Sequence, residues 1–169
     1  DTKTHVRDCF DGLDVPITVA HLGMNKRPHT GQVPNTIMTD RPYFVALGTL
    51  EPRKNHALLL DIWEDLAQEN PASELPYLHI IGRRGWKNEG LFNRLDAHHL
   101  TGKVIFEHGA LPDPEARALI SGARALLFPS HAEGFGYPPL EALEDGVLPI
   151  CADLAVLKET LGDSAVYLD

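Results

Sequence analysis

Apolar runs recur along the chain, and most are separated by segments in which apolar residues have helical spacing. The runs cover residues 17–22, 42–48, 77–82, 104–109, 123–130, 147–153 and 165–168. Most are continuously apolar rather than alternating, which is typical of strands covered on both faces of a sheet. Strands that alternate with helices predict an α/β fold with a doubly wound parallel β-sheet, helices on both faces and right-handed crossovers.

The segments between the runs carry recognisable helix signals. Residues 55–69 are the clearest, because their apolar residues share one stripe, namely Leu58, Leu59, Ile62, Trp63 and Leu66, and Asn55 suits the N-cap. Further helices are expected at 89–100, from Asp113 as a cap with Pro114 at the first position, from Pro138 and Pro139 through Glu144, and at 154–161. Residues 23–41 are rich in Gly, Pro, Asn and Thr and predict a long surface loop.

Composition narrows the class of protein. The 169 residues, 43% of them hydrophobic and 23% charged, indicate one globular domain. No apolar run reaches the roughly 18 residues that a membrane span needs, and no secretory leader is visible. Two cysteines, Cys9 and Cys151, make no disulfide framework, so a cytoplasmic protein is expected. The net charge of −9 argues against binding to nucleic acid or to anionic membranes, yet leaves room for a local anion site.

Ligands of doubly wound sheets bind where strands end and helices begin, which selects the loops 48–55, 82–88, 109–113 and 130–139. In the loop GTLEPRKN, Arg53 and Lys54 stand at the N-terminus of a predicted helix, where the helix dipole disfavours cations. This unfavourable position favours a phosphate-binding role for them over that of solvated surface charges. The loop GRRGWKN adds Arg83, Arg84 and Lys87, so one edge of the sheet holds five of the 15 basic residues. For Arg84 and Lys87 the alternative is an ordinary polar loop residue, and we expect Trp86 to pack rather than to stack on a ligand.

The loop EGFGYPPLE places Glu133 and Glu141 around two glycines and two prolines. Gly134 and Gly136 allow positive φ and close approach of the backbone to a ligand. Carboxylates accept hydrogen bonds from vicinal hydroxyls, so two of them facing a cleft suit a sugar and a ribose with a phosphate between. Stabilisation by the helix dipole is the alternative for Glu141.

The sequence gives little support for a metal site, a serine nucleophile or an NAD-binding site. His98 and His99 are adjacent and expected to point to different faces, and HExxH is absent, so no metal site is expected. Ser130 lacks the histidine and acid that would make it a nucleophile. An NAD-dependent oxidoreductase is disfavoured because no strand is followed by GxGxxG.

Taken in order, several segments resemble a known family. GTLEPRKN, IIGRRGW, EGFGYPPLEAL and GVLPICADLAVLKETLGDSAVYLD resemble the C-terminal, donor-binding half of a GT-B glycosyltransferase of the retaining family 4, also called group 1. The E-x7-E motif, here Glu133 to Glu141, is the most specific of these elements. The resemblance covers the chain from about Ile17 to its end and implies a Rossmann-like sheet.

The resemblance also implies roles for individual residues. Glu133 would bind hydroxyls of the donor sugar and Glu141 the ribose, while backbone groups of Gly134, Phe135 and Gly136 would touch the sugar or the diphosphate. Lys54, with Arg53 beside it, would neutralise the departing diphosphate. Main chain near Arg83 and Leu111 would hold the base. Many members have an arginine at the position of Thr49, and Arg53 is the expected substitute for its phosphate contact.

The implied function is transfer of a hexose, with mannose favoured, from a nucleotide-diphosphate sugar to a saccharide or lipid-linked acceptor, without a metal cofactor. The resemblance implies a linker or hinge-side segment at 1–16 and a donor-binding domain at 17–169 without its final helices. The acceptor would bind the missing N-terminal half, the full enzyme would associate peripherally with the inner face of the membrane, and the isolated chain would be inactive. Two alternatives remain open: a non-catalytic sugar-nucleotide-binding module, and a sugar-nucleotide epimerase or phosphorylase of the same fold.

Overall fold

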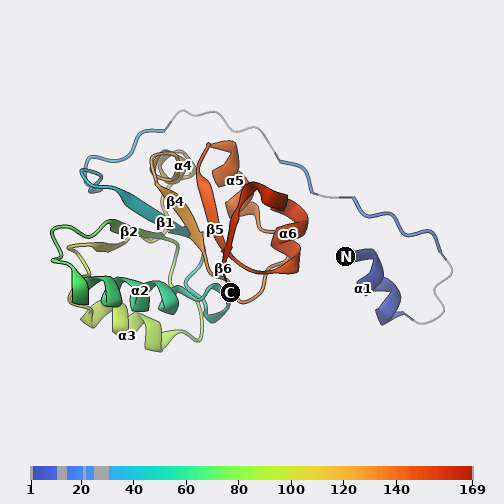
Figure 1. The fold of residues 1–169 in the computed structure, drawn as a ribbon, viewed down its shortest axis with the longest axis horizontal. Helices are drawn as coiled ribbons and strands as arrows, with labels where there is room; N and C mark the ends of the chain where they lie inside the picture. Colours follow the sequence, from blue (N-terminus) through green and yellow to red (C-terminus); the bar gives the residue numbers. More distant parts are fainter. Residues whose placement is uncertain (1, 11–14, 21, 25–30, 169) are drawn as a thin grey trace.

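Six parallel strands form the centre of the molecule (Figure 1). The computed structural model describes residues 2–10, 15–20, 22–24 and 31–168. The strands are β1 (Tyr43–Leu47), β2 (Tyr77–Ile81), β3 (Ile105–Glu107), β4 (Ala125–Phe128), β5 (Leu148–Ala152) and β6 (Val166–Leu168). They lie in the order β3-β2-β1-β4-β5-β6 and every pairing is parallel. The predicted doubly wound parallel sheet is confirmed.

Helices connect the strands and cover the sheet from both sides. They are α2 (His56–Glu69), α3 (Glu89–Ala97), α4 (Asp113–Ser121), α5 (Tyr137–Glu144) and α6 (Ala155–Leu161), with 3₁₀ turns η1 (Pro52–Lys54) and η2 (Gly162–Ser164). Figure 1 shows α2 and α3 together on one side of the sheet and α4 and α5 on the other. From β1 the chain moves outward to β3, and from β4 it moves outward to β6. The order therefore reverses between β1 and β4, which is where sheets of this kind bind ligands.

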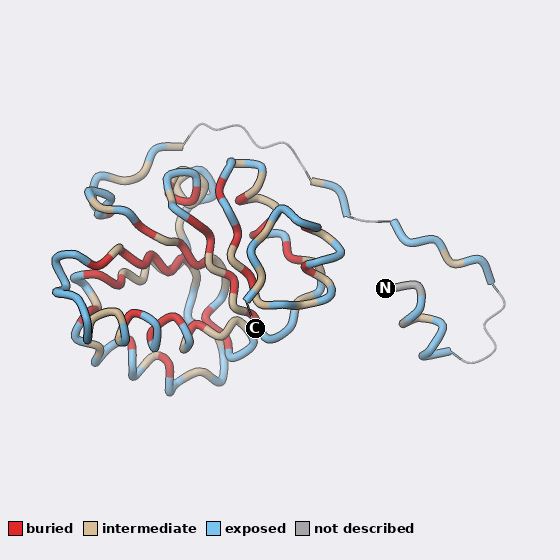
Figure 2. The backbone as a smooth tube through the Cα atoms, viewed as in Figure 1, coloured by how far each residue is buried: buried red, intermediate tan, exposed pale blue. Residues whose placement is uncertain are grey.

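The core follows from the apolar runs. All five residues of β2 are buried, and Figure 2 shows burial concentrated on the strands and on the inner sides of the helices. Of the predicted stripe on α2, Leu59 and Trp63 are buried, whereas Leu58 and Ile62 are exposed. These two side chains line an apolar cleft of about 530 Å³ between α2 and the strands β4 to β6. The apolar stripe of α2 is thus buried only in part, because its Leu58 and Ile62 side faces this open cleft rather than a packed element.

Several local predictions are wrong. Among the described residues of the run 17–22, none forms a strand, and Val19 and Leu22 are exposed. A strand needs a hydrogen-bonded neighbour, and this run has none; His21 lies outside the described residues. Asn55 does occupy the N-cap position of α2, but its backbone is left-handed (φ 53°) and its side chain makes no capping bond. Asp113 is the first residue of α4 rather than its cap, which is Pro112.

The N-terminal part contains one helix that the sequence did not predict, α1 (Thr2–Cys9), drawn apart from the sheet in Figure 1. In the expected loop, residues 31–41 have no helix or strand, and Ile37 is buried against the core. Within the described ranges, no helix has the length and apolar character needed to cross a bilayer.

Candidate functional site

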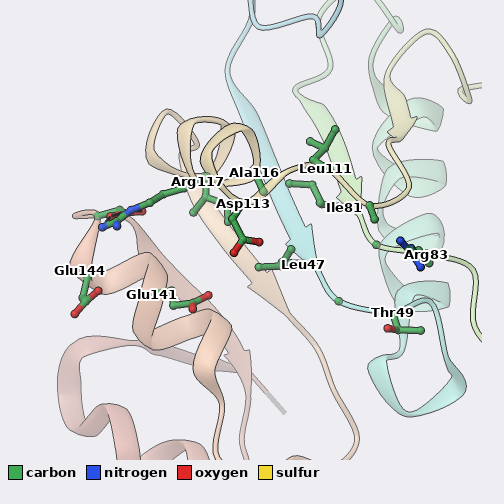
Figure 3. A pocket seen from close by; sticks show the side chains of 15 residues that line it. Leu47, Thr49, Ile81, Arg83, Leu111, Asp113, Ala116, Arg117, Glu141 and Glu144 are labelled. Carbon is green, nitrogen blue, oxygen red and sulfur yellow. Dashed lines mark hydrogen bonds and ion pairs between the residues drawn. The ribbon is translucent and has the colours of Figure 1, made fainter. Parts of the chain in front are cut away.

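A pocket of about 510 Å³ opens at the carboxyl ends of β1 and β2, between α4 and α5 (Figure 3). The strand ends contribute Leu47, Thr49, Ile81 and Arg83, and the two helices contribute acids and one arginine. The labelled residues of the helical side are Asp113, Ala116, Arg117, Glu141 and Glu144. An apolar floor with charged groups around the rim is typical of a site for a small polar ligand.

Four of the residues predicted to contact the donor line this pocket. They are Thr49, Arg83, Leu111 and Glu141. Figure 3 shows Glu141 on the α5 side, with Arg83 and Thr49 on the far side at the strand ends. The pocket thus has an acidic side at α5 and an exposed arginine at the strand ends, and the assignment of ribose and base to these two sides stays a prediction.

The remaining charged residues of the prediction form a separate cluster beside the pocket. Lys54 Nζ donates a hydrogen bond to Glu133 Oε1 at 2.7 Å, and Arg53 Nη1 lies 3.0 Å from Glu133 Oε2. Arg53 Nη2 also donates to Glu51 Oε1 at 2.5 Å. Each oxygen of Glu133 therefore already has a cationic partner. We call these four residues, Glu51, Arg53, Lys54 and Glu133, the ion-pair quartet.

The ion-pair quartet is buried on its acidic side and electrically balanced. The side chains of Glu51 and Glu133 are 6% and 8% exposed, Lys54 is nearly as buried, and Arg53 is half-exposed. Burial acts to raise the pKa of Glu133, but the hydrogen bond from Lys54 and the two neighbouring cations outweigh it, and the pKa lies below its ordinary value. Two carboxylates facing two cations leave no net charge, so an arriving anion has to displace a carboxylate from a cation.

Gly48 connects the quartet with the pocket. It lines the pocket, and its φ of 144° is one that L side chains rarely adopt. A Cβ atom placed there would lie 3.2 Å from Cε of Lys54. The Lys54 side chain therefore lies beside Gly48, a residue of the pocket wall, although Lys54 itself is not part of the lining.

The glycine-rich loop before α5 packs against α6 and does not line the pocket. Gly136 is the N-cap of α5 with φ 92°, and a Cβ there would lie 2.4 Å from Cδ2 of Leu157. The carbonyl of Phe135 accepts a hydrogen bond from Thr160 at 3.2 Å. Gly134 has no positive φ and has open space where a Cβ would stand. The prediction that this position requires glycine is therefore not supported.

One element of the pocket was missed in the sequence. Arg117 of α4 donates from Nε to both oxygens of Asp145, at 2.9 Å each, and Asp145 is the C-cap of α5. The Asp145 side chain is 2% exposed. This pair ties together the two helices that wall the pocket. Arg117 stands four residues after Asp113 on the same helix, a spacing that could have identified it, but nothing in the sequence pointed to Asp145.

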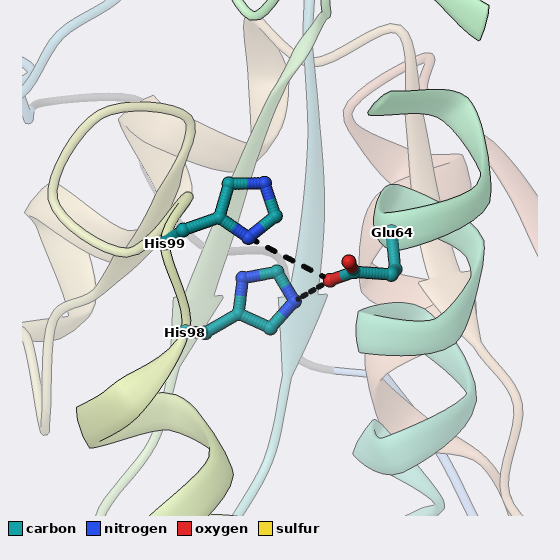
Figure 4. Close-up of side chains that lie close together, drawn as sticks. All are labelled: Glu64, His98 and His99. Carbon is teal, nitrogen blue, oxygen red and sulfur yellow. Dashed lines mark ion pairs between the residues drawn. The ribbon is translucent and has the colours of Figure 1, made fainter. Parts of the chain in front are cut away.

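A cluster of potential metal ligands lies elsewhere, between α2 and the residues after α3 (Figure 4). His98 Nε2 and His99 Nδ1 lie 2.8 and 3.8 Å from Glu64 Oε2, and the two rings stack with centroids 5.1 Å apart. The prediction that the rings point to different faces is therefore wrong. The Leu100 N–H donates to His98 Nδ1 at 3.2 Å, which leaves the hydrogen of a neutral ring on Nε2. Because that nitrogen is the one facing Glu64, the cluster is poorly arranged for a metal ion.

Two other loop predictions can be compared with the structure. Trp86 does not pack into the core, since its side chain is 64% exposed. Arg84 turns away from the pocket and bonds Glu107 and Asp96, so it has a structural role. Of the five cations predicted at this edge, Arg83 lines the pocket and Lys54 and Arg53 belong to the quartet.

Comparison with known proteins identifies relatives. Residues 32–166 match the family model described as glycosyl transferases group 1. The chain is 34% identical over 156 residues to the serotype-specific mannosyltransferase WbdA of Escherichia coli, covering 92% of this chain and 18% of that protein. It is also 34% identical over 128 residues to the O-antigen chain mannosyltransferase B of Escherichia coli, covering 75% of this chain and 32% of that protein. The chain thus spans about a fifth to a third of these curated relatives.

Solved structures have the same fold. The crystal structure of TarM aligns with 99% of this chain, and this chain covers 31% of it, with a TM-score of 0.69 and 15% sequence identity. At that identity the likeness concerns the fold alone.

Proposed function

The chain belongs to the glycosyl transferases group 1 family, and from that premise we propose that it is the donor-binding domain of a retaining glycosyltransferase. The donor is a nucleotide-diphosphate sugar and the transferred group a hexose. Mannose is the favoured hexose because the relatives named above are mannosyltransferases. The predicted start of the domain at residue 17 stays a prediction, since the strand on which it rested is not formed.

The pocket beside the ion-pair quartet is the observation that carries this proposal. The pocket would take the nucleoside, with the ribose hydroxyls donating to Glu141 and the base lying toward Arg83 and Leu111. Its volume of about 510 Å³ is within the range of small-molecule sites. The diphosphate would then lie near Gly48, alongside Lys54.

The quartet would act on the reacting part of the donor. The diphosphate takes Lys54 from Glu133, and the freed carboxylate accepts hydrogen bonds from the sugar hydroxyls. When the bond between the anomeric carbon and the phosphate oxygen breaks, its electron pair leaves with the diphosphate. The cation of Lys54 neutralises the charge that develops there, which lowers the barrier. Arg53 remains between Glu51 and Glu133 and keeps the two loops together.

The acceptor in this proposal is a saccharide or a lipid-linked saccharide, as the name of the O-antigen chain relative suggests. It would be bound mainly by another part of a longer protein, as would any peripheral contact with a membrane. The chain described here would bind the donor but would not transfer sugar by itself.

Calorimetry on the 169-residue chain tests the proposal. One of GDP, UDP and ADP should bind, and Lys54→Ala should weaken that binding by more than about 1 kcal/mol, the scale of a charge-assisted hydrogen bond. Arg94→Ala is the matched control, because Arg94 pairs with Asp61 on the outer side of α2 and α3. A folded chain that binds none of the three nucleotides would contradict the proposal, as would equal losses from both variants.

A further inference from the structure

Few aromatic side chains are exposed in the described part of the chain, and two of them follow strands at the carboxyl edge of the sheet. In the described part of the chain, the large aromatic side chains classed as exposed are Phe10 at 61%, Trp86 at 64% and Tyr137 at 39%. Phe10 follows α1, outside the sheet. Trp86 and Tyr137 both belong to segments that follow carboxyl ends of strands, β2 and β4 respectively. Trp86 contributes little to the core, and its ring is available to a ligand at this edge.

The strand order puts the loop that carries Arg53 and Lys54 between the segments that carry these two aromatics. β2 and β4 are the two neighbours of β1, and that loop follows β1. The bridge between Leu50 and Arg84 joins the segment after β2 to this loop, so the segment that carries Trp86 runs directly beside it.

The loop that presents Trp86 is held against the donor pocket. The Leu50 N–H donates to the Arg83 carbonyl at 2.9 Å, and the Gly85 N–H donates to the Leu50 carbonyl at 3.2 Å. A Cβ on Gly85 would lie 2.7 Å from Cγ2 of Thr49, which lines the pocket. The residue directly before Trp86 thus touches the pocket wall, whereas Trp86 itself is not part of the lining.

The surroundings of Trp86 favour a saccharide over an apolar partner. Its neighbours Arg83 and Lys87 are exposed cations, and Trp86 belongs to neither apolar core cluster. A bilayer or an apolar protein surface would need more apolar area than one indole ring supplies. A pyranose ring has one face of C–H groups with partial positive charge, which matches the negative face of an indole, while its hydroxyls stay in water or bond nearby polar groups.

From this geometry we propose that Trp86 is a stacking platform for a hexose unit of the acceptor saccharide. The inference rests on the proposed function, because it takes the quartet as the point of sugar transfer. It extends that function by giving this domain a direct contact with the acceptor beside its donor pocket.

Two-dimensional NMR of the chain tests this assignment, because the sequence contains just two tryptophans. Trp63 is 2% exposed and its indole N–H donates to the Pro76 carbonyl at 2.9 Å, so it is an internal control. Titration with an α-linked mannotriose should shift the indole resonance of Trp86 and leave that of Trp63 in place. Titration with nucleoside diphosphate should shift the amide resonances of pocket residues such as Thr49 and leave the Trp86 indole in place.

Variants complete the test. Trp86→Ala should weaken mannotriose binding, measured by saturation transfer to the saccharide, by roughly two- to tenfold, the effect of losing one aromatic contact. Trp86→Phe should retain part of the binding. Phe10→Ala, which removes an equally exposed ring away from the edge, should change nothing.

Three results would overturn the assignment. They are an unmoved Trp86 resonance with mannotriose, a shift produced by nucleotide alone, and a shift produced by phosphatidylglycerol vesicles but not by mannotriose. If nucleotide binds the pocket and the saccharide does not move Trp86, this inference fails while the proposed function stands. If no nucleotide binds, the proposed function fails first.

Discussion

Replacing Glu133 by Gln should strengthen the binding of a bare nucleoside diphosphate. In the ligand-free protein Glu133 is 8% exposed and holds Lys54 through a 2.7 Å hydrogen bond. A diphosphate that takes Lys54 leaves this buried carboxylate with Arg53 as its cation, and that loss opposes binding. Glutamine keeps the shape and the carbonyl oxygen but has no charge to leave behind.

The size of the effect follows from the contacts that change. A hydrogen bond to a charged group contributes about 1.5–3 kcal/mol, and a neutral one about 0.5–1.5 kcal/mol. The half-exposed Arg53 contact is screened by solvent and adds little to the difference. With glutamine, Lys54 still donates a charge-assisted bond to the amide oxygen but loses its ion pair with the carboxylate, which should favour the bare diphosphate by about 1–2 kcal/mol, or about 5–30-fold in affinity.

A hexose on the nucleotide should reverse this gain. In the wild type the sugar hydroxyls donate to the freed carboxylate, and these bonds are stronger than the same bonds to an amide. The ratio of affinities, nucleotide sugar over bare nucleotide, should therefore fall in Glu133→Gln. Isothermal titration with both ligands measures this ratio, and urea unfolding checks that the variant is folded. A variant with unchanged or weaker affinity for the bare nucleotide would refute the exchange of Lys54 between Glu133 and phosphate.

Three further predictions concern other parts of the site and the core. Glu141→Ala should weaken bare nucleotide by about 1–3 kcal/mol in the same titration, through the lost hydrogen bonds to ribose; an unchanged affinity would remove Glu141 from that role. Arg117→Met should lower the free energy of unfolding by about 3–5 kcal/mol in urea, because it removes the arginine that pairs with the buried Asp145; a loss below about 1 kcal/mol would contradict this. Burial lowers the pKa of His56 and of His79 to about 4 from an ordinary 6.5. As the pH falls, these histidines are therefore protonated in the unfolded state before they are in the folded state, so the free energy of unfolding should decrease from pH 6.5 toward pH 4. His79→Phe should reduce this decrease, and a free energy of unfolding that stays constant across this window would contradict the prediction.

The sheet and its helices were predictable because each carries its own local signal. Continuous apolar runs identify buried parallel strands, and Pro138 and Pro139 mark the start of α5. The position of the pocket followed from topology alone, since ligands of such sheets bind at the carboxyl ends of the strands. Thr49 and Arg83, from the loops after β1 and β2, and Glu141, from the first half of α5, line one pocket, as that rule predicts.

The errors arise where a local pattern depends on a distant partner. The run 17–22 is apolar enough for a strand, but its composition carries no information on whether a neighbouring strand is available. The bond between Lys54 and Glu133 joins residues 79 positions apart, and no spacing rule predicts which cation a carboxylate will choose. Trp86 was expected to pack rather than to stack on a ligand, yet a loop residue has no periodicity that indicates the direction of its side chain.

The sequence also could not show which part of the sheet the helices leave uncovered. Leu58 and Ile62 have the spacing of core residues and nevertheless face an apolar cleft of about 530 Å³. This cleft is about as large as the pocket between α4 and α5, but its lining is mostly apolar. Size alone therefore does not show which cavity is the better candidate ligand site. The charged groups around the pocket between α4 and α5 favour that pocket.

A crystal structure of the chain with bound nucleoside diphosphate tests the central claim most directly. The account predicts the nucleoside between α4 and α5, with its ribose against Glu141, and Lys54 turned from Glu133 to the phosphate. A nucleotide bound in the apolar cleft beside α2, or one in the pocket with Lys54 still bonded to Glu133, would contradict it.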